Sequence, residues 1–518
     1  MIFKHGMRGA RYAALPSLIL WTIIFWAIIA LSACSSTSTP TLPYPSLVPS
    51  AITFFTPSAT PNPAKKVFAH YMLSIAAFSG AHGTLANYEE EIIMAQTLGI
   101  DGFAIDVGAW NSEYQQNAAL MFQAAADLNS GFVIFLTVDG LSYQDIISFM
   151  MEYANNPNYF KYNGQPVLSA FYGEGASQSN STYPTALTWW PGEVMGPLAA
   201  QGINCFFIPD MPDMTSPSTP ASEVTYWSKL VNGLFTFTAA MGVTNNDGGN
   251  DLYIPTIGGY QVALSAINKI YMAGAVAKYW GARQPTNGNI YFEWQGGAGI
   301  DAQWKAIIAD NVPWVELITW NDFNESYIMP MDDFEKYNDW GQPLGWWKPT
   351  FGYAELLRYY IAWFKTGAQP TITNDSIFWF YRTQPAAASA ANATTGGEGQ
   401  TGPVSRYIPN PPSGAVPSNA DQMFVTVMAT VPGTLTSSMG NFSAPVVAGI
   451  NQFTIPFVAG PAPTFQLSRN GATVINATGA DVILANPPYY NWWASSGFAE
   501  GNSVRQALEI AVQPRKGP

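Results

Sequence analysis

The feature that most constrains the fold is a series of short apolar runs, rich in β-branched and aromatic residues, between residues 65 and 323. Segments with a helical pattern, such as residues 87–99 and 143–156, separate several of these runs. Near-continuous apolar strands that alternate with helices are typical of a parallel sheet, and eight of them predict a closed (β/α)8 TIM-type barrel. The eight predicted strands are residues 67–72, 102–108, 132–139, 166–175, 205–211, 233–238, 252–259 and 314–320.

The pattern changes after the barrel region. Residues 384–419 are rich in Ala, Gly, Ser and Pro. Alternating apolar runs then follow at residues 423–431, 451–458 and 464–469. Short alternating strands with Gly and Pro turns predict a C-terminal β-sandwich. We therefore expect a barrel over residues 65–370 and a β-rich domain over residues 371–518, which packs on the barrel through the aromatic run 378–381.

The N-terminus has the pattern of an export signal. Three basic residues precede the apolar run 17–33, which ends at Cys34. The ending Leu-Ser-Ala-Cys resembles a bacterial lipobox, so residues 1–34 are interpreted as a lipoprotein signal segment and Cys34 as the lipidated residue of a cell-surface protein. An uncleaved membrane helix is the alternative. The uncharged Ser/Thr/Pro-rich segment 35–64 is predicted to be an extended linker.

Composition limits the class of partner. The net charge is −13 and the Lys and Arg residues form no cluster, which argues against a nucleic-acid partner. The chain contains 18 Trp and 26 Tyr, and most of these aromatic residues are expected to fill the core. Aromatic faces together with acidic side chains also suit a neutral, polyhydroxylated ligand, so composition favours a sugar over a nucleotide.

Acidic residues gather at the ends of the predicted strands, which is where a barrel of this type places its working residues. The residues expected at this rim are His70, Tyr71, Asp106, Asp139, Glu174, Asp210, Trp320, Asn321, Asp322, Glu325 and Tyr327. Paired carboxylates without metal-binding histidines suit glycosidic cleavage, in which one acid protonates the leaving oxygen and another activates water or attacks. The structural alternative for Asp322 is that its side chain caps the following turn.

Other chemistries fit the sequence less well. The three histidines, His5, His70 and His82, have no zinc-motif spacing, and no G-x-S-x-G motif is present. Residues 297–302 loosely resemble a dinucleotide fingerprint but read better as the start of a helix. Cys205 lies in an apolar run and is predicted to be a buried small hydrophobe. We expect neither a metal nor a cofactor.

Several segments resemble glycoside hydrolase family 71, the α-1,3-glucanases or mutanases. They are residues 67–72, 98–108, 163–175, 203–211 and, most specifically, 314–330, "WVELITWNDFNESYIMP". The resemblance implies endo-hydrolysis of α-1,3-glucan with inversion of the anomeric centre. It implies catalytic roles for Asp322 and Glu325, with Asp139 in support, and substrate contacts from the other rim residues.

The sequence departs from that family's pattern at three single positions and in the predicted seventh strand, where residues 253–262 lack the family's usual Ser-Pro-Trp. Asn324 stands where the family usually has Gly, Tyr327 where it has His, and Asp106 where it has Asn. These changes fall at the substrate rim and leave the exact glucan open. Two alternatives therefore stand beside an α-1,3-glucanase: a non-catalytic glycan-binding surface lipoprotein, and a hydrolase of another α-linked glycan.

Overall fold

The computed structural model describes residues 45–48, 54–75, 83–175, 178–211, 219–237, 249–281, 290–323, 325–330, 347–390, 406–407, 420–501, 503–505 and 511–514. The chain forms two compact units. One is Ser46–Gln513, and the other comprises Met1–Pro45 and Pro514–Pro518, of which only Pro45 and Pro514 are described. Among the described residues, no helix is long and apolar enough to cross a membrane. The predicted signal segment, with Cys34, lies outside the described residues.

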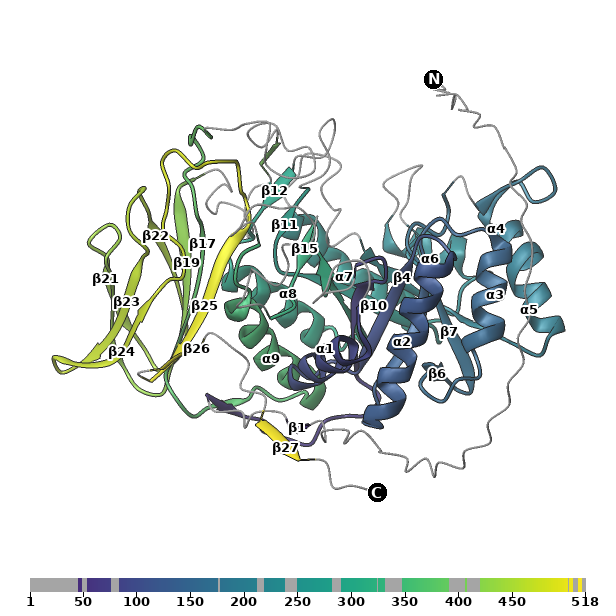
Figure 1. Ribbon diagram of the computed structural model, residues 1–518, viewed down its shortest axis with the longest axis horizontal. Helices are drawn as coiled ribbons and strands as arrows, with labels where there is room; N and C mark the ends of the chain where they lie inside the picture. Colours follow the sequence, from purple (N-terminus) through teal and green to yellow (C-terminus); the bar gives the residue numbers. More distant parts are fainter. Residues whose placement is uncertain are drawn as a thin grey trace, which may run out of the picture. The chain divides into compact units, whose positions relative to one another are not determined.

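The larger unit begins with a parallel (β/α)8 barrel, as the sequence predicts (Figure 1). Its strands are β3 (Lys66–Met72), β4 (Gly102–Val107), β5 (Val133–Val138), β7 (Gln165–Ala170), β8 (Phe206–Phe207), β9 (Gly233–Thr236), β10 (Ile270–Val276) and β13 (Trp314–Ile318). Neighbours in sequence pair in parallel, and β13 pairs with β3. Two contacts link β8 to β9 and so close the barrel. One is a parallel bridge between Asp210 and Phe235, and the other is a 2.8 Å hydrogen bond from the Asn232 N–H to the Phe207 carbonyl.

Helices connect and surround these strands (Figure 1). They are α1 (Leu85–Thr97), α2 (Ser112–Leu128), α3 (Tyr143–Tyr153), α4 (Ala186–Trp189), a π-helical turn (Trp190–Met195), α5 (Gly196–Ala200), α6 (Pro220–Trp227), α7 (Gly249–Ser265), α8 (Gly297–Ala309) and α9 (Phe351–Thr366). Several begin where a polar side chain accepts a hydrogen bond from a free backbone N–H of the first turn: Thr84 caps α1, Asn111 caps α2 and Ser142 caps α3.

One predicted strand is wrong. Residues 252–259 lie within helix α7, and the seventh barrel strand is β10. The run is rich in β-branched and aromatic residues, which suggests a strand. However, Ile257 and Leu264 are seven residues apart and both fully buried, which is the spacing of one helix face. The true strand, Ile270–Val276, contains smaller residues and is buried along most of its length.

Side chains alternate between the barrel interior and the surrounding helices. Inside, Phe68, Phe135, Phe160 and Trp314 form an aromatic floor, with the Phe68 ring centre 5.0 Å from that of Phe135 and 5.9 Å from that of Trp314. Removing one such buried aromatic side chain typically destabilises a protein by about 3–5 kcal/mol. The floor closes one end of the barrel, and the polar residues of the interior lie above it.

Antiparallel sheets follow the barrel, as predicted. The first contains β17 (Ser376–Arg382), β19 (Gln422–Ala429), β22 (Gly449–Pro456), β25 (Ala494–Glu500) and β26 (Ser503–Arg505). The second contains β20 (Gly433–Ser437), β21 (Ser443–Val446), β23 (Thr464–Arg469) and β24 (Ala472–Thr478). The two faces of strand β17 pack in different cores. Phe378 and Phe380 join the barrel core, while Trp379 and Tyr381 join the core between the sheets.

The remaining strands are short. They are β1 (Pro45–Val48), β2 (Phe55–Thr56), β6 (Lys161–Tyr162), β11 (Tyr279–Trp280), β12 (Ile290–Phe292), β14 (Asn321–Asp322), β15 (Ser326–Tyr327), β16 (Thr371–Ile372), β18 (Arg406–Tyr407) and β27 (Ala511–Pro514).

The predicted linker, residues 35–64, ends earlier in the structure. Phe54 and Phe55 are buried, and β2 pairs with β16. The Phe54 ring centre lies 5.5 Å from that of Phe378. The chain therefore contributes to the buried core from Phe54 onward, because the side chains of Phe54 and Phe55 are buried.

Candidate active site

Asp322 and Glu325 lie on a tight hairpin that follows the eighth barrel strand. Its strands β14 and β15 pair antiparallel. The Asp322 N–H donates to Thr319 Oγ1 at 2.8 Å, and the Glu325 N–H donates to the Asp322 carbonyl at 3.2 Å. Asp322 is 9% exposed and Glu325 is partly exposed. The hairpin thus holds both carboxylates at the C-terminal mouth of the barrel, where working residues are expected.

The segment after β10 fixes Glu325 from a second side. The Trp280 N–H donates to the Glu325 carbonyl at 2.9 Å. The Tyr279 hydroxyl forms a hydrogen bond with the Glu325 side chain, and burial together with the charges of Glu325 and Asp322 raises the pKa of Tyr279 well above its ordinary value. Tyr279 therefore remains a neutral donor that orients Glu325.

Asp139 follows β5 and belongs to the same cluster of charges. Burial, with the charges of Asp106 and Asp322, raises the pKa of Asp139 from 3.8 to about 6, although the charge of His70 opposes this rise. Like charges in a partly dehydrated site disfavour ionisation of one another. Asp139 and Asp322, which the sequence predicts as catalytic, therefore interact electrostatically across the barrel mouth.

His70 lies inside the barrel between two acids. Its Nδ1 is 2.7 Å from Glu316 Oε1 and its Nε2 is 3.1 Å from Asp106 Oδ2. All three side chains are at most 5% exposed. Burial by itself would lower the pKa of His70, but the hydrogen bonds and charges of Asp106 and Glu316 outweigh it and raise that pKa to about 10. His70 is placed below the mouth rather than at its surface.

Asp210 and Glu174 form a second acidic group on the other side of the barrel. Burial raises the pKa of Asp210 well above 3.8, and the charges of Glu223, Glu174 and Glu316 add to this effect. The Phe237 N–H, which donates to Asp210 Oδ1 at 3.1 Å, opposes it in part. The side chain of Glu174 is partly exposed, so Glu174 is the member of this pair that reaches toward solvent.

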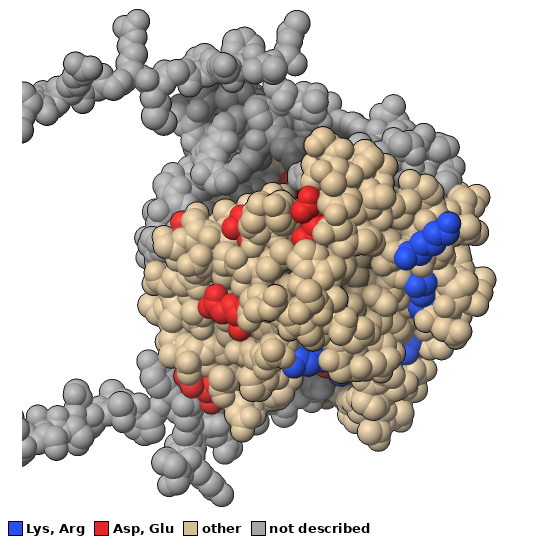
Figure 2. All heavy atoms as spheres, turned by 90° about the vertical axis from the view of Figure 1, so that its right-hand side faces the viewer, with Lys and Arg blue, Asp and Glu red and all other residues tan. Residues whose placement is uncertain are grey.

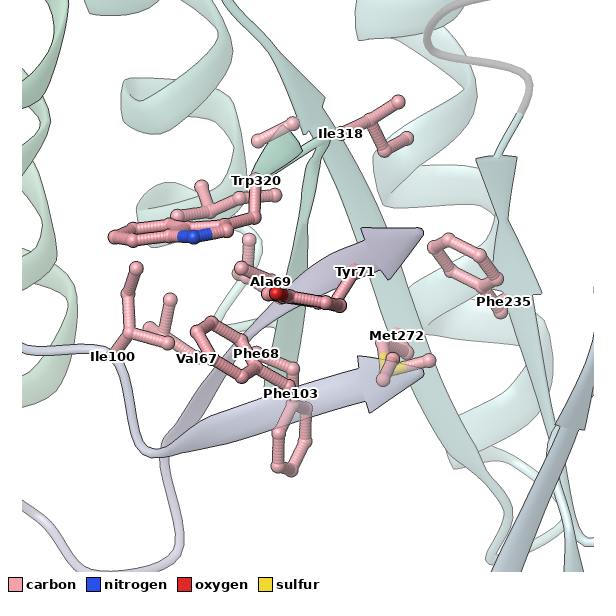
Figure 3. Packing of buried hydrophobic residues seen from close by; sticks show 14 of the residues in the cluster. Val67, Phe68, Ala69, Tyr71, Ile100, Phe103, Phe235, Met272, Ile318 and Trp320 are labelled. Carbon is pink, nitrogen blue, oxygen red and sulfur yellow. The ribbon is translucent and has the colours of Figure 1, made fainter. Parts of the chain in front are cut away.

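Tyr71 and Trp320 do not reach the mouth, although the sequence predicted substrate contacts for both. Figure 3 shows Trp320 near Ala69 and away from Phe235 and Met272. The Trp320 Nε1–H donates to Glu91 Oε2 on helix α1 at 3.0 Å. Both aromatic side chains are fully buried. For Tyr71 the correction follows from strand alternation, since it is adjacent to the inward side chain of His70 on β3. Trp320 lies beyond the end of β13, and its hydrogen bond to Glu91 directs its ring toward α1.

Asn321 and Tyr327 are likewise buried structural residues rather than substrate contacts. Asn321 Oδ1 accepts from the Met72 N–H at 2.8 Å, and its Nδ2 donates to the Ile75 carbonyl at 2.7 Å. The Tyr327 hydroxyl accepts from the Lys348 N–H at 2.8 Å and is 3.1 Å from the Lys348 carbonyl. These contacts hold the hairpin in place and leave neither side chain exposed.

Sequence reasoning missed three side chains near this site. Glu316 and Tyr279 are described above. Tyr114 on α2 is the third, because its pKa is raised by burial and then by the charges of Asp106 and Asp139. A glutamate within the apolar run 314–320 was the one available signal. The two tyrosines had none, since the chain has 26 of them.

The whole folded region resembles a known family. Residues 63–508 match the model of glycosyl hydrolase family 71. The chain belongs to this family. It is 28% identical over 448 residues to the glucan endo-1,3-alpha-glucosidase agn1 of Schizosaccharomyces pombe, an alignment that covers 84% of this chain and 95% of that protein. It is 26% identical over 452 residues to the mutanase Pc12g07500 of Penicillium rubens, with 84% of this chain and 89% of that protein covered.

Solved structures resemble the barrel more distantly. The GH99 endo-alpha-mannosidase of Bacteroides thetaiotaomicron matches with a TM-score of 0.44 and 15% identity, over 57% of this chain and 97% of that one.

The protein is therefore a glycoside hydrolase of family 71, and Asp322 and Glu325 lie at the mouth of its barrel. Among the described residues, no three His, Cys, Asp or Glu side chains are placed to hold a metal ion.

Cys205 is mostly buried, and burial raises the pKa of its thiol to about 12. Figure 2 shows one face of the molecule, where most visible acidic side chains lie apart from one another on the left, and most visible Lys and Arg side chains lie toward the right-hand edge.

Proposed function

We propose that this protein hydrolyses α-1,3-glucan and inverts the configuration at the anomeric carbon. Two aligned relatives are named as an endo-1,3-alpha-glucosidase and a mutanase, and both alignments span most of each protein. The observation that carries the proposal is the electrostatic interaction of Asp139 with Asp322, on the same hairpin that holds Glu325. Acids whose environments push their pKa values apart suit paired acid and base roles.

In the proposed reaction, Glu325 is the general acid and Asp322 is the general base. Glu325 gives its proton to the glycosidic oxygen as the bond from that oxygen to the anomeric carbon breaks. Asp322 accepts a proton from a water molecule whose oxygen bonds to the anomeric carbon from the opposite face. The products are a glucan with a β-configured reducing end and a second glucan with a free hydroxyl. Asp139, whose charge interacts with that of Asp322, keeps the two protonation states apart.

The product configuration tests the mechanism. Proton NMR of the reaction on α-1,3-glucan, recorded before mutarotation, is expected to show the β-anomer first. An initial α-anomer, or a trapped glycosyl-enzyme, would make one of these acids a nucleophile. A parallel panel of α-1,4-glucan, β-1,3-glucan and other α-linked glycans tests the substrate. Binding of α-1,3-glucan without hydrolysis would support a non-catalytic glycan-binding protein instead.

Two substitutions test the residue assignment. Asp322→Asn and Glu325→Gln are each expected to reduce kcat by about 10²–10⁴-fold, the usual contribution of general acid–base groups. Asp127→Asn is a matched control, because Asp127 is exposed on helix α2 and forms a hydrogen bond there with Gln123. Losses below tenfold for both site variants, with the control unchanged, would contradict the assignment.

We also propose that the enzyme works at the cell surface, held by a lipid on Cys34. The support is the sequence pattern alone: basic residues, an apolar run and a small-residue ending before the cysteine. A surface enzyme would meet a glucan polymer without importing it. The corresponding substitution is described in the Discussion.

A further inference from the structure

His70 contacts two buried acids, one through each nitrogen of its ring. Nδ1 and Nε2 each face a carboxylate oxygen, at 2.7 Å from Glu316 and 3.1 Å from Asp106. An imidazolium donates from both nitrogens, whereas a neutral imidazole donates from one and accepts at the other. A neutral ring could satisfy both contacts only if one of the acids carried a proton.

The three residues come from neighbouring strands, which fixes the arrangement. Glu316 lies on β13, His70 on β3 and Asp106 on β4, and these strands pair in parallel in that order. The Phe237 ring centre lies 5.0 Å from that of His70. The relay, defined as Glu316, His70 and Asp106, is therefore set in the barrel wall and packed against an apolar ring.

The relay leads from the barrel interior to the proposed catalytic acids. The charges of Asp106 and His70 both act on Asp139, with opposite signs, and the charge of Asp322 acts on Asp139 from the hairpin. The charge of Glu316 acts on Asp210, which follows strand β8, and the charges of Asp106 and Asp139 act on Tyr114 of α2. Among the described residues, His70 is the cation whose charge acts on Asp139, in a group that otherwise contains acids and Tyr114.

We propose that His70 is a positioning residue: Glu316 holds it as a permanent imidazolium, and it in turn fixes Asp106 and supplies the positive charge that balances the acids at the barrel mouth. This role rests on the proposed function of those acids. None of the three relay side chains needs to touch the glucan. Glu316 anchors the relay from β13, since its Oε1 atom lies 2.7 Å from His70 Nδ1.

The charge of His70 can be measured without substrate. The chain has three histidines, so histidine labelled with 13C at Cε1 gives at most three resonances in the full-length protein. His5→Gln and His82→Gln assign the His70 resonance by elimination. We expect it to keep the imidazolium shift from about pH 5 to about pH 9, well beyond the ordinary histidine pKa of about 6.5. A His70 resonance that titrates near 6.5, or that keeps the neutral shift throughout, would overturn the proposal.

Glu316→Gln tests the coupling to catalysis. The amide keeps the size of the side chain but removes its charge, so the pKa of His70 falls and its resonance titrates within the measured range. We expect kcat to fall by about tenfold or more on the alkaline side of that same titration, because the neutral ring no longer supplies the positive charge that balances the acids. KM should change little. A positioning role predicts that the pH midpoint of the His70 resonance agrees with the pH midpoint of kcat, since a merely structural defect would lower activity at every pH.

A matched control lies beside the relay. Thr137 faces Asp106 across β4 and β5, is fully buried, and its hydroxyl has no hydrogen-bond partner among the described residues. Thr137→Val keeps the shape and adds no charge, so the pH profile and the His70 resonance should stay as in the wild type. If kcat of Glu316→Gln depended on pH in the same way as kcat of Thr137→Val, the positioning role would be refuted. If the wild type failed to hydrolyse α-1,3-glucan, the proposed function would fall while the NMR titration still tested the charge of His70.

Discussion

Asp139→Asn should make the protein more stable and less active at neutral pH. The pKa of the Asp139 carboxyl rises from 3.8 to about 6 on folding, through burial and the charges of Asp106 and Asp322. The folded state therefore binds more protons than the unfolded state between these values, and stability falls as pH rises through that window. Above about pH 6 the ionised carboxylate destabilises the fold in full, and asparagine removes this penalty.

The size of the effect follows from the shift. At about 1.4 kcal/mol for each pKa unit, a rise from 3.8 to about 6 corresponds to about 3 kcal/mol. Asp139 keeps partial contact with solvent, which screens its charge, so we expect about 1–2 kcal/mol of added stability. The free energy of unfolding in urea, followed by tryptophan fluorescence, should differ between wild type and Asp139→Asn at about pH 8 and converge at about pH 4.

Activity should move in the opposite direction, with kcat reduced by at least about tenfold. Asp127→Asn, on the exposed face of α2, is the control for removing a carboxylate and should change neither quantity. A variant with unchanged stability at about pH 8, or with a gain that persists at about pH 4, would refute the reasoning, because its effect would not come from the ionised carboxylate.

Four further outcomes are expected. Cys34→Ser should release the protein from membranes or block its maturation, as shown by fractionation; unchanged fractionation would support an uncleaved helix. Cys205→Ser should leave kcat unchanged, because that thiol is largely buried and protonated. A chain ending at residue 370 should aggregate in light scattering, because it would expose the barrel surface that Phe378 and Phe380 cover. Lys278→Met should raise the melting temperature at neutral pH, and raise it less in alkali, where the wild-type amine is neutral. The reason is that the Lys278 amine is buried without a hydrogen-bond partner among the described residues, and burial lowers its pKa.

The barrel was predictable from the sequence where a strand is buried on both faces and ends in an acid. β4, with Asp106 near its end, and β5, followed directly by Asp139, have this character. The prediction failed at residues 252–259 because a helix packed between other helices is also apolar, and short apolar runs do not distinguish the two periods. Propensity favoured a strand there, and tertiary burial of Ile257 and Leu264 favoured the helix.

The rim of acids was predictable for a topological reason, because parallel strands end at one edge. The orientation of each side chain was not. In a strand buried on both faces, the apolar residues of the two faces are alike in sequence. The direction of the Tyr71 side chain could therefore not be told from that of His70, and Trp320 could not be told from the residues that face the mouth. Glu316 could have been found, since a charged residue within a buried strand needs a partner, and the histidine of the neighbouring strand was available.

The C-terminal sheets also contribute to the site. The Trp493 ring centre lies 4.8 Å from that of Tyr327, on the hairpin that carries Asp322 and Glu325. The Tyr327 hydroxyl bonds to the backbone of Lys348, whose Nζ lies 2.7 Å from Asp481 Oδ1, just after strand β24. Two contacts from the C-terminal domain therefore converge on one side of the hairpin. Because a displacement of about 1 Å can cost about 10²-fold in rate, this domain sets the position of the proposed acid and base as well as covering the barrel.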